Sequence, residues 1–135
     1  HALSLISPRG IDTLLIVVAD VPAVSTRDIE SVLDALPSDR GAVICPSVAH
    51  GTSALALRPP DALPFRFGQR SFLAHKREAA ARALPVRVLH LHSLANDIDS
   101  PDDLLNLITQ PADSTTHRLL ERLRLPRRLQ TIHRP

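Results

Sequence analysis

Short apolar runs alternate with amphipathic segments along the chain. Residues 13–19 read TLLIVVA, a continuous apolar run rich in β-branched side chains, which is typical of a strand buried on both faces. Further apolar runs at residues 42–46, 53–58 and 86–91 predict three more strands. Because strands and helices alternate through residues 13–110, the pattern predicts an α/β sandwich with a mainly parallel sheet.

Helices are predicted where a capping residue precedes a helical apolar stripe. Ser25 or Thr26 can cap a helix that runs to about residue 36, and Ser100 followed by Pro101 begins another. Residues 71–83 and 116–125 predict two further helices. Residues 47–52 form a loop between two strands, and residues 59–68 contain three prolines and a glycine, so no regular structure is expected there.

Composition narrows the class of protein. Hydrophobic residues make up 44% of the chain but aromatic residues only 2%, so the core must be built from aliphatic side chains. No run of about 18 apolar residues is present, so we expect no membrane span. The single cysteine, Cys45, cannot form an internal disulfide and lies in an apolar run, where we expect a small core residue. These features favour a cytoplasmic protein.

Positive charge is concentrated near the end of the chain. The formal net charge is +2, and residues 111–135 carry six arginines against Asp113 and Glu121. We therefore divide the chain into a domain portion, residues 1–110, and an Arg-rich tail, residues 111–135, whose simplest form is a solvated or docked helix. A basic tail can contact nucleic acid, but we do not expect nucleic acid as a partner.

Three aspartates follow predicted strands. Asp20 closes the first strand, and Asp97 and Asp99 lie between the last strand and the helix at Ser100. Ligands of open α/β sheets bind beyond the carboxyl ends of the strands, and carboxylate oxygens suit Mg²⁺ bound to a nucleotide phosphate. The alternatives are a turn carboxylate for Asp20 and extra capping for the other two.

Other chemical motifs are absent or open to a simpler explanation. The sequence contains no P-loop, no G-x-G-x-x-G and no G-x-S-x-G. His90 and His92 alternate on a predicted strand and could bind zinc, although a solvent-facing pair explains them more simply. Phe65 and Phe67 could flank a pocket, although ordinary packing explains them too.

The segments taken together resemble a known family. The run LLIVVADVPAVSTRDIESVL is similar to the central strand, metal-binding aspartate and following helix of Rossmann-like nucleotidyltransferases. More narrowly, the ordered motifs G-T-x-A-L, R-P-P, F-R-F-G, S-F-x-x-H and D-I-D-x-P-x-D-L resemble the 2-phospho-L-lactate guanylyltransferase family, whose bacterial members include phosphoenolpyruvate guanylyltransferases. The resemblance covers roughly residues 12–108 and implies a Rossmann-like, three-layer fold of the GT-A-like nucleotidyltransferase type.

The resemblance also implies a reaction and two sets of site residues. GTP would give GMP to 2-phospho-L-lactate or phosphoenolpyruvate and release pyrophosphate, in coenzyme F-420 biosynthesis. The first set holds Mg²⁺ and is catalytic: Asp20, Asp97 and Asp99. The second set holds the phosphorylated three-carbon acid: Thr52, Gly68 and Ser71.

The chain departs from that family in two places. Ser53 stands where the family usually has Asn, and residues 47–50 replace an Asp-Arg-x-Gly stretch, so nucleotide contacts from this loop are not carried over. The family also opens with a strand and a basic K-x-R-L loop that hold the guanine nucleotide, whereas this chain begins at His1, shortly before the strand at residues 13–19. We therefore expect the fold to be N-terminally incomplete.

An incomplete sheet has consequences for activity. Unpaired strand edges are liabilities, so we expect little guanylyltransferase activity from the isolated chain unless a homodimer or other oligomer covers the edge. Two alternatives remain: another nucleotidyltransferase of the same superfamily, and a non-catalytic shortened homologue that acts as an interaction module.

Overall fold

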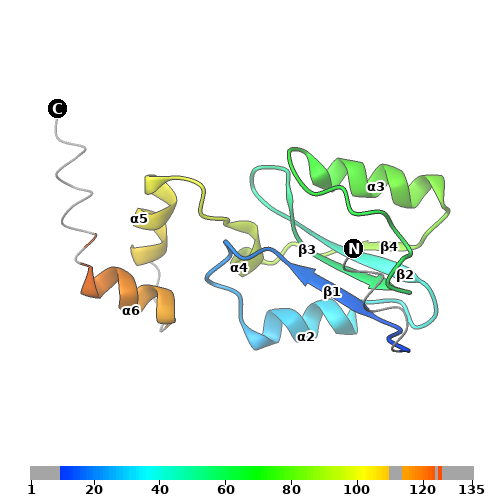
Figure 1. Ribbon diagram of the computed structural model, residues 1–135, viewed down its shortest axis with the longest axis horizontal. Helices are drawn as coiled ribbons and strands as arrows, with labels where there is room; N and C mark the ends of the chain where they lie inside the picture. Colours follow the sequence, from blue (N-terminus) through cyan, green and yellow to red (C-terminus); the bar gives the residue numbers. More distant parts are fainter. Residues whose placement is uncertain (1–9, 110–113, 124, 126–135) are drawn as a thin grey trace.

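Four strands form a single sheet in the computed structural model, which describes residues 10–109, 114–123 and 125. The sheet has the order β1-β3-β2-β4, and its strands are β1 (Leu14–Val17), β2 (Gly41–Pro46), β3 (Thr52–Arg58) and β4 (Val86–Val88). Helices α2 (Thr26–Asp34) and α3 (Ser71–Ala81) lie on opposite faces of the sheet in Figure 1. The described residues therefore form a three-layer α/β structure.

The sheet is mixed, and the mainly parallel sheet predicted from the sequence is wrong for the described strands. β1 and β2 both pair antiparallel with β3, and the β2–β4 pair is parallel. The cause is the connection between β2 and β3, residues 47–51. So short a link can only turn the chain back as a hairpin, because a parallel crossover needs about a dozen residues or more.

The core lies on both faces of the two central strands. Side chains of β2 and β3 that face α2 pack with residues of that helix and its end: Val43, Cys45, Ala54, Ala56, Val32 and Leu36. Side chains on the other face pack with α3 and the segments beside it: Ala42, Ile44, Leu55, Leu57, Leu63, Ala79 and Leu84. Burial raises the pKa of the Cys45 thiol to about 11, aided by the charge of Asp28. Cys45 is therefore the core residue predicted and is a poor nucleophile.

Two helices begin with the caps that the sequence predicts. Ser25 Oγ accepts from the Asp28 backbone nitrogen at 3.3 Å, and Asp28 Oδ2 accepts from the Ser25 nitrogen at 2.7 Å, which forms a capping box. At the start of α5 (Pro101–Thr109), Ser100 and Asp103 exchange the same bonds at 3.3 and 2.8 Å. Both helices therefore have defined starts.

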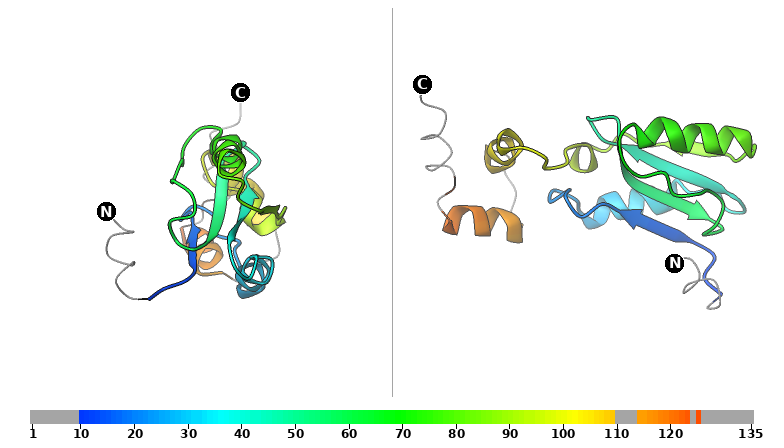
Figure 2. Two further views of the ribbon diagram at one scale, coloured as in Figure 1. Left: turned by 90° about the vertical axis from the view of Figure 1, so that its right-hand side faces the viewer. Right: turned by 45° about the horizontal axis from the view of Figure 1, so that its top comes forward.

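Beyond β4 the chain leaves the sheet. Helices α4 (His92–Ala95), α5 and α6 (Thr115–Arg122) extend to one side of it (Figures 1 and 2). Because β4 ends at Val88 and His92 begins α4, His90 and His92 do not alternate on a strand, and that prediction is wrong. Helix α6 falls within the predicted Arg-rich tail, while residues 110–113, 124 and 126–135 lie outside the described residues. No helix among those the structure describes has the length and apolar character needed to cross a bilayer.

A buried histidine joins α5 to α6. His117 Nε2 lies 2.8 Å from the Leu107 carbonyl oxygen, and Nδ1 lies 2.8 Å from Ser114 Oγ. A carbonyl oxygen can only accept, so Nε2 of His117 carries a proton and donates it to Leu107. This bonding pattern holds the two helices together.

Candidate functional site

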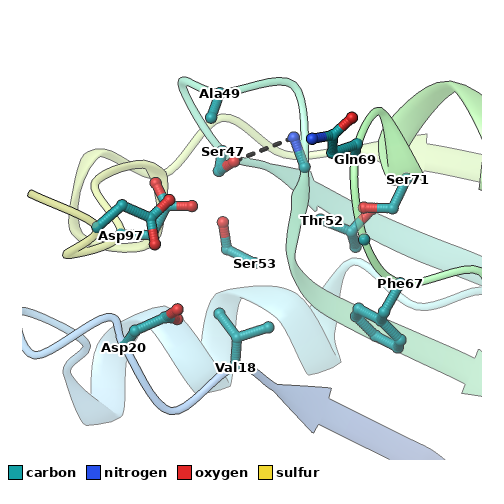
Figure 3. Close-up of a pocket in the computed structure, with 13 residues that line it drawn as sticks. Val18, Asp20, Ser47, Ala49, Thr52, Ser53, Phe67, Gln69, Ser71 and Asp97 are labelled. Carbon is teal, nitrogen blue, oxygen red and sulfur yellow. Dashed lines mark hydrogen bonds between the residues drawn. The ribbon is translucent and has the colours of Figure 1, made fainter.

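An open cavity of about 290 Å³ lies beyond the carboxyl ends of β1, β2 and β4. Residues of the β2–β3 hairpin line this cavity. All six residues that the sequence resemblance singled out line it as well: Asp20, Thr52, Gly68, Ser71, Asp97 and Asp99. Figure 3 shows the labelled side chains around one space. The volume is near the lower end of the roughly 300–1,000 Å³ typical of ligand sites, and it suits a small acid better than a whole nucleoside triphosphate.

Backbone hydrogen bonds between loops hold the cavity together. At the tip of the β2–β3 hairpin, the Val48 nitrogen donates to the Ala95 carbonyl at 2.9 Å, and the His50 carbonyl accepts from the Phe72 nitrogen at 3.4 Å. The hairpin is thereby fastened to α4 on one side and to α3 on the other. The Ile98 nitrogen donates to the Asp20 carbonyl at 3.0 Å, which brings the loop after β1 beside the loop that carries Asp97 and Asp99.

The three aspartates share the cavity without forming a compact cluster. Asp20 and Asp99 are exposed and Asp97 is half-buried, and in Figure 3 Asp20 lies below Asp97 on a separate loop. Among residues 10–109, 114–123 and 125, no three acidic, histidine or cysteine side chains converge closely enough to hold a metal ion by themselves. Their oxygen donors nevertheless match the ligands that Mg²⁺ prefers.

Hydroxyl groups line the opposite wall. The side chains of Thr52 and Ser71 are almost completely buried, and both residues line the cavity. Ser53 Oγ is without a partner among the described residues and is closed to solvent. Ser47 Oγ accepts from the Gly51 nitrogen at 3.1 Å. Hydroxyls can donate to the oxygens of phosphates and carboxylates, so this wall can bind an anion.

A β-bulge explains why two consecutive residues of one strand line the same cavity. Cys45 pairs with Ala54 and Pro46 with Thr52, so the register skips Ser53. In a regular strand Thr52 and Ala54 would face the same side, towards α2. The bulge breaks this alternation and directs Thr52 to the α3 side, where it bonds to that helix.

Ser71 and Gly68 are placed by the backbone around the start of α3. The N-cap of α3 is Arg70, in the left-handed conformation with φ of 55°, and it makes no side-chain cap bond. Ser71 is therefore the first helical residue and not the cap, and Thr52 belongs to β3 and not to a turn. Gly68 has φ of +119°, where L side chains are strained, and a Cβ there would touch nothing within 4 Å. The chain requires glycine here for its backbone conformation.

One residue of the site was not recognised from the sequence. His75, the last residue of the S-F-x-x-H motif, is completely buried and bonds to Thr52 Oγ1 at 3.0 Å. The Phe67 ring lines the cavity, which was one of the two interpretations offered for it from the sequence. It meets the His75 ring edge-on, with 5.2 Å between the ring centroids. The spacing of Ser71 and His75 could have signalled this, because residues four apart share one helix face.

The charge around the cavity is unbalanced. Three carboxylates line it, and none of the described lining residues is a lysine, arginine or histidine. Arg66 is nearby in sequence but pairs with Glu78 at 3.0 Å on the surface, where such pairs are worth little. An anionic ligand would therefore need a cation or a basic group from elsewhere.

The chain is similar to a known family of enzymes and to several of its members. Residues 6–132 match the family described as Guanylyl transferase CofC like. A phosphoenolpyruvate guanylyltransferase of Sphaerobacter thermophilus is 49% identical over 100 residues, covering 73% of this chain and 48% of the relative. A 3-phospho-D-glycerate guanylyltransferase of Colwellia psychrerythraea is 37% identical, covering 78% and 51%. A 2-phospho-L-lactate guanylyltransferase of Methanothermobacter thermautotrophicus is 34% identical, covering 84% and 50%.

The chain spans about half the length of these curated relatives. A solved structure from Desulfovibrio desulfuricans, described as a nucleotide-diphospho-sugar transferase, superposes with a TM-score of 0.77 at 22% identity. It covers 96% of this chain, and the chain covers 59% of it. At this identity the likeness establishes a shared α/β fold with a mixed sheet and nothing about the ligand.

Proposed function

The chain belongs to the family of CofC-like guanylyl transferases, and from that premise we propose that its cavity takes part in guanylyl transfer from GTP to a phosphorylated three-carbon acid. A phosphate oxygen of the acid attacks the α-phosphorus of GTP, a new P–O bond forms, and the bond to the departing pyrophosphate breaks. The attacking oxygen is already anionic, so no general base is needed and catalysis rests on positioning and electrostatics. The observation that carries the proposal is that all six residues implied by the resemblance line one cavity.

The hydroxyl wall is the proposed site for the acid. Thr52 and Ser71 offer hydroxyl donors, and Ser71 lies in the first turn of α3, where the helix dipole favours an anion. The Ser71 nitrogen already donates to the Gly68 carbonyl at 3.1 Å, and the Phe72 nitrogen donates to the His50 carbonyl. Because these two N–H groups are occupied, the side-chain hydroxyls are the main donors. The turn at Gly68 positions Ser71.

The carboxylate side of the cavity is the proposed site for Mg²⁺. Asp20, Asp97 and Asp99 supply oxygen ligands, and Mg²⁺ is usually held by one or two carboxylates together with substrate phosphates and water. Three carboxylates that share a cavity without converging fit that mode of binding. When bound, Mg²⁺ neutralises charge on the reacting phosphates. Without a cation these carboxylates would repel both substrates, since no described lining residue is basic.

We propose phosphoenolpyruvate as the acid, because the relative with 49% identity is named for it. The other candidates are 3-phospho-D-glycerate and 2-phospho-L-lactate, after the names of the other two relatives. Each acid combines a phosphate with a carboxylate on a three-carbon chain, which suits a wall of several hydroxyl donors. We place the reaction in coenzyme F-420 biosynthesis and in the cytoplasm, following the sequence resemblance.

A complete catalytic unit needs more strands than the described residues supply. β1 pairs with β3 alone among the described strands, and its four apolar residues are only half-buried. We propose that further strands, from another segment of the protein or from a second copy in a homodimer, pair with the free edge of β1. Such additions would complete the Rossmann-like sheet and provide the wall and the basic groups for the guanine nucleotide.

The test combines binding with turnover. The chain is titrated with phosphoenolpyruvate by calorimetry, with and without Mg²⁺, and then incubated with GTP, the acid and Mg²⁺, alone or with the other half of the Sphaerobacter relative. We expect Mg²⁺-dependent binding by the chain alone, little pyrophosphate release alone, and clear release on complementation. Absence of Mg²⁺-dependent binding of all three acids would refute the proposed function.

Two further arms separate the alternatives. Sugar phosphates and other phosphorylated acids are titrated under the same conditions, and preference for one of them would indicate another nucleotidyltransferase activity. RNA is titrated at several salt concentrations, because tight binding with a steep salt dependence would favour the interaction module. We expect neither ligand to bind as tightly as phosphoenolpyruvate.

A further inference from the structure

His75 connects two walls of the cavity from inside the fold. It lies in the middle of α3 and is completely buried. Its Nδ1 lies 3.0 Å from Thr52 Oγ1 on β3, and its Nε2 lies 3.0 Å from the backbone nitrogen of Arg66. Arg66 belongs to the irregular segment that also carries Phe67 and Gly68. One imidazole therefore contacts both the strand and the loop that border the proposed acid site.

The partner of Nε2 decides which nitrogen carries the proton. A backbone N–H can only donate, so Nε2 accepts from Arg66 and has no hydrogen of its own. Burial, followed by the charge of Arg66 and opposed by Glu78, lowers the pKa of His75 below its ordinary value of 6.5. The ring is therefore neutral at pH 7 with its proton on Nδ1, and it donates to Thr52 Oγ1.

That donation determines the direction of the Thr52 hydroxyl. Because Oγ1 already accepts from His75, the hydrogen of the hydroxyl must find a different acceptor. The described residues provide none, and Thr52 lines the cavity. The hydroxyl can thus donate to an oxyanion. In the other tautomer, with the proton on Nε2, the Thr52 hydroxyl would donate its hydrogen to Nδ1 of His75. It could then only accept hydrogen bonds from a ligand in the cavity.

We propose that His75 is a positioning residue for acid binding, which holds Thr52 as a hydrogen-bond donor to the phosphate or carboxylate of the bound acid. This inference rests on the proposed function for the identity of the ligand. The tautomer on which it depends can be measured without any ligand. Failure of the inference and failure of the proposed function can therefore be told apart.

The first experiment reads the tautomers in the free chain by NMR of ¹⁵N-labelled imidazole rings. We expect the proton of His75 on Nδ1. His117 serves as an internal reference, because its bond to the Leu107 carbonyl requires the proton on Nε2. A His75 spectrum of the same type as that of His117 would overturn the inference, whatever the chain binds.

The second experiment separates the two hydrogen bonds of His75. In His75→Asn the amide nitrogen lies near the place of Nδ1 and can still donate to Thr52. In His75→Gln the amide oxygen lies near the place of Nε2 and can still accept from Arg66. We expect His75→Gln to weaken phosphoenolpyruvate binding about tenfold, as does loss of a hydrogen bond to a charged group. The affinity of His75→Asn for phosphoenolpyruvate should stay within about threefold of that of the unaltered chain. This change is well below the tenfold loss expected when the hydrogen bond to the acid is lost.

Controls distinguish positioning from loss of structure. His117 is also buried, but neither it nor its hydrogen-bond partners Ser114 and Leu107 are among the described residues that line the cavity. His117→Gln should therefore leave the affinity for the acid unchanged. In a Thr52→Val background, His75→Gln should have no further effect on acid binding, because its action runs through the Thr52 hydroxyl. Equal losses in the two backgrounds, or unaltered binding by His75→Gln, would overturn the inference. Absence of acid binding by the unaltered chain would instead refute the proposed function.

Discussion

Replacing Ser71 with alanine should weaken acid binding without weakening the fold. If Ser71 were a helix cap, its loss would cost about 1 kcal/mol of stability. The structure assigns the N-cap of α3 to Arg70, without a side-chain cap bond. No cap bond is lost, and alanine has a helix propensity about 0.5 kcal/mol better than serine. We therefore expect the free energy of unfolding to stay constant or to rise by about 0.5 kcal/mol.

The same change should reduce affinity for phosphoenolpyruvate by about tenfold or more, since a hydrogen bond to a charged group is worth roughly 1.5–3 kcal/mol. Calorimetry at fixed Mg²⁺ measures the affinity, and urea unfolding measures the stability. Ser25→Ala is the matched control, because Ser25 caps α2 outside the cavity. It should lose about 1 kcal/mol of stability and keep its affinity. Unchanged acid binding in Ser71→Ala, or a stability loss equal to that of Ser25→Ala, would refute this reasoning.

Three further predictions concern charge and burial. Each of Asp20→Asn, Asp97→Asn and Asp99→Asn should leave the unfolding curve intact and weaken Mg²⁺-dependent acid binding at least tenfold, or by roughly 1.4 kcal/mol; three variants with unaltered Mg²⁺ titrations would contradict the metal site. The pKa of His75 is lowered in the fold, so the unfolded chain binds a proton more readily than the folded chain as the pH falls below 6.5. The free energy of unfolding should therefore be highest above pH 6.5 and decrease below it. Urea unfolding between pH 7 and 5 should show a smaller decrease for His75→Gln than for the unaltered chain. Ser53→Ala should raise the free energy of unfolding by about 1 kcal/mol, because it removes a buried hydroxyl that has no partner; a stability loss would show that Ser53 is bonded in solution.

The positions of the strands and helices could be predicted from the sequence better than the relative directions of the strands. The apolar runs that became β1, β2 and β3 were found because branched aliphatic residues cluster there, and the caps at Ser25 and Ser100 were found because their bonding partners are local. An apolar run carries no information on strand direction, so the mainly parallel sheet was predicted from the alternation of strands and helices alone. The short loop at residues 47–51 could have corrected it, since it permits only a hairpin.

The candidate site was anticipated in two ways, from the position of three aspartates after predicted strands and from the residues that the resemblance named. The resemblance brought Thr52 and Ser71 together, and the structure places both on one wall. It could not show that a bulge at Ser53 turns Thr52 towards α3, because one skipped residue leaves no pattern in the sequence. Nor could it identify His75 as the partner of Thr52, since the second bond of His75 comes from a backbone nitrogen in an irregular segment.

The central hairpin also bears on how the chain folds. β2 and β3 are adjacent in sequence and buried on both faces, so the most buried part of the sheet forms through local contacts. Pairing of β1 with β3 must bridge some 40 residues and closes a longer loop, as between Leu14 and Leu57. We expect the hairpin to be the folding nucleus and its amide hydrogens to exchange most slowly with solvent. β1, which pairs with a single neighbour among the described strands, should exchange faster, and it should open first when the protein is destabilised.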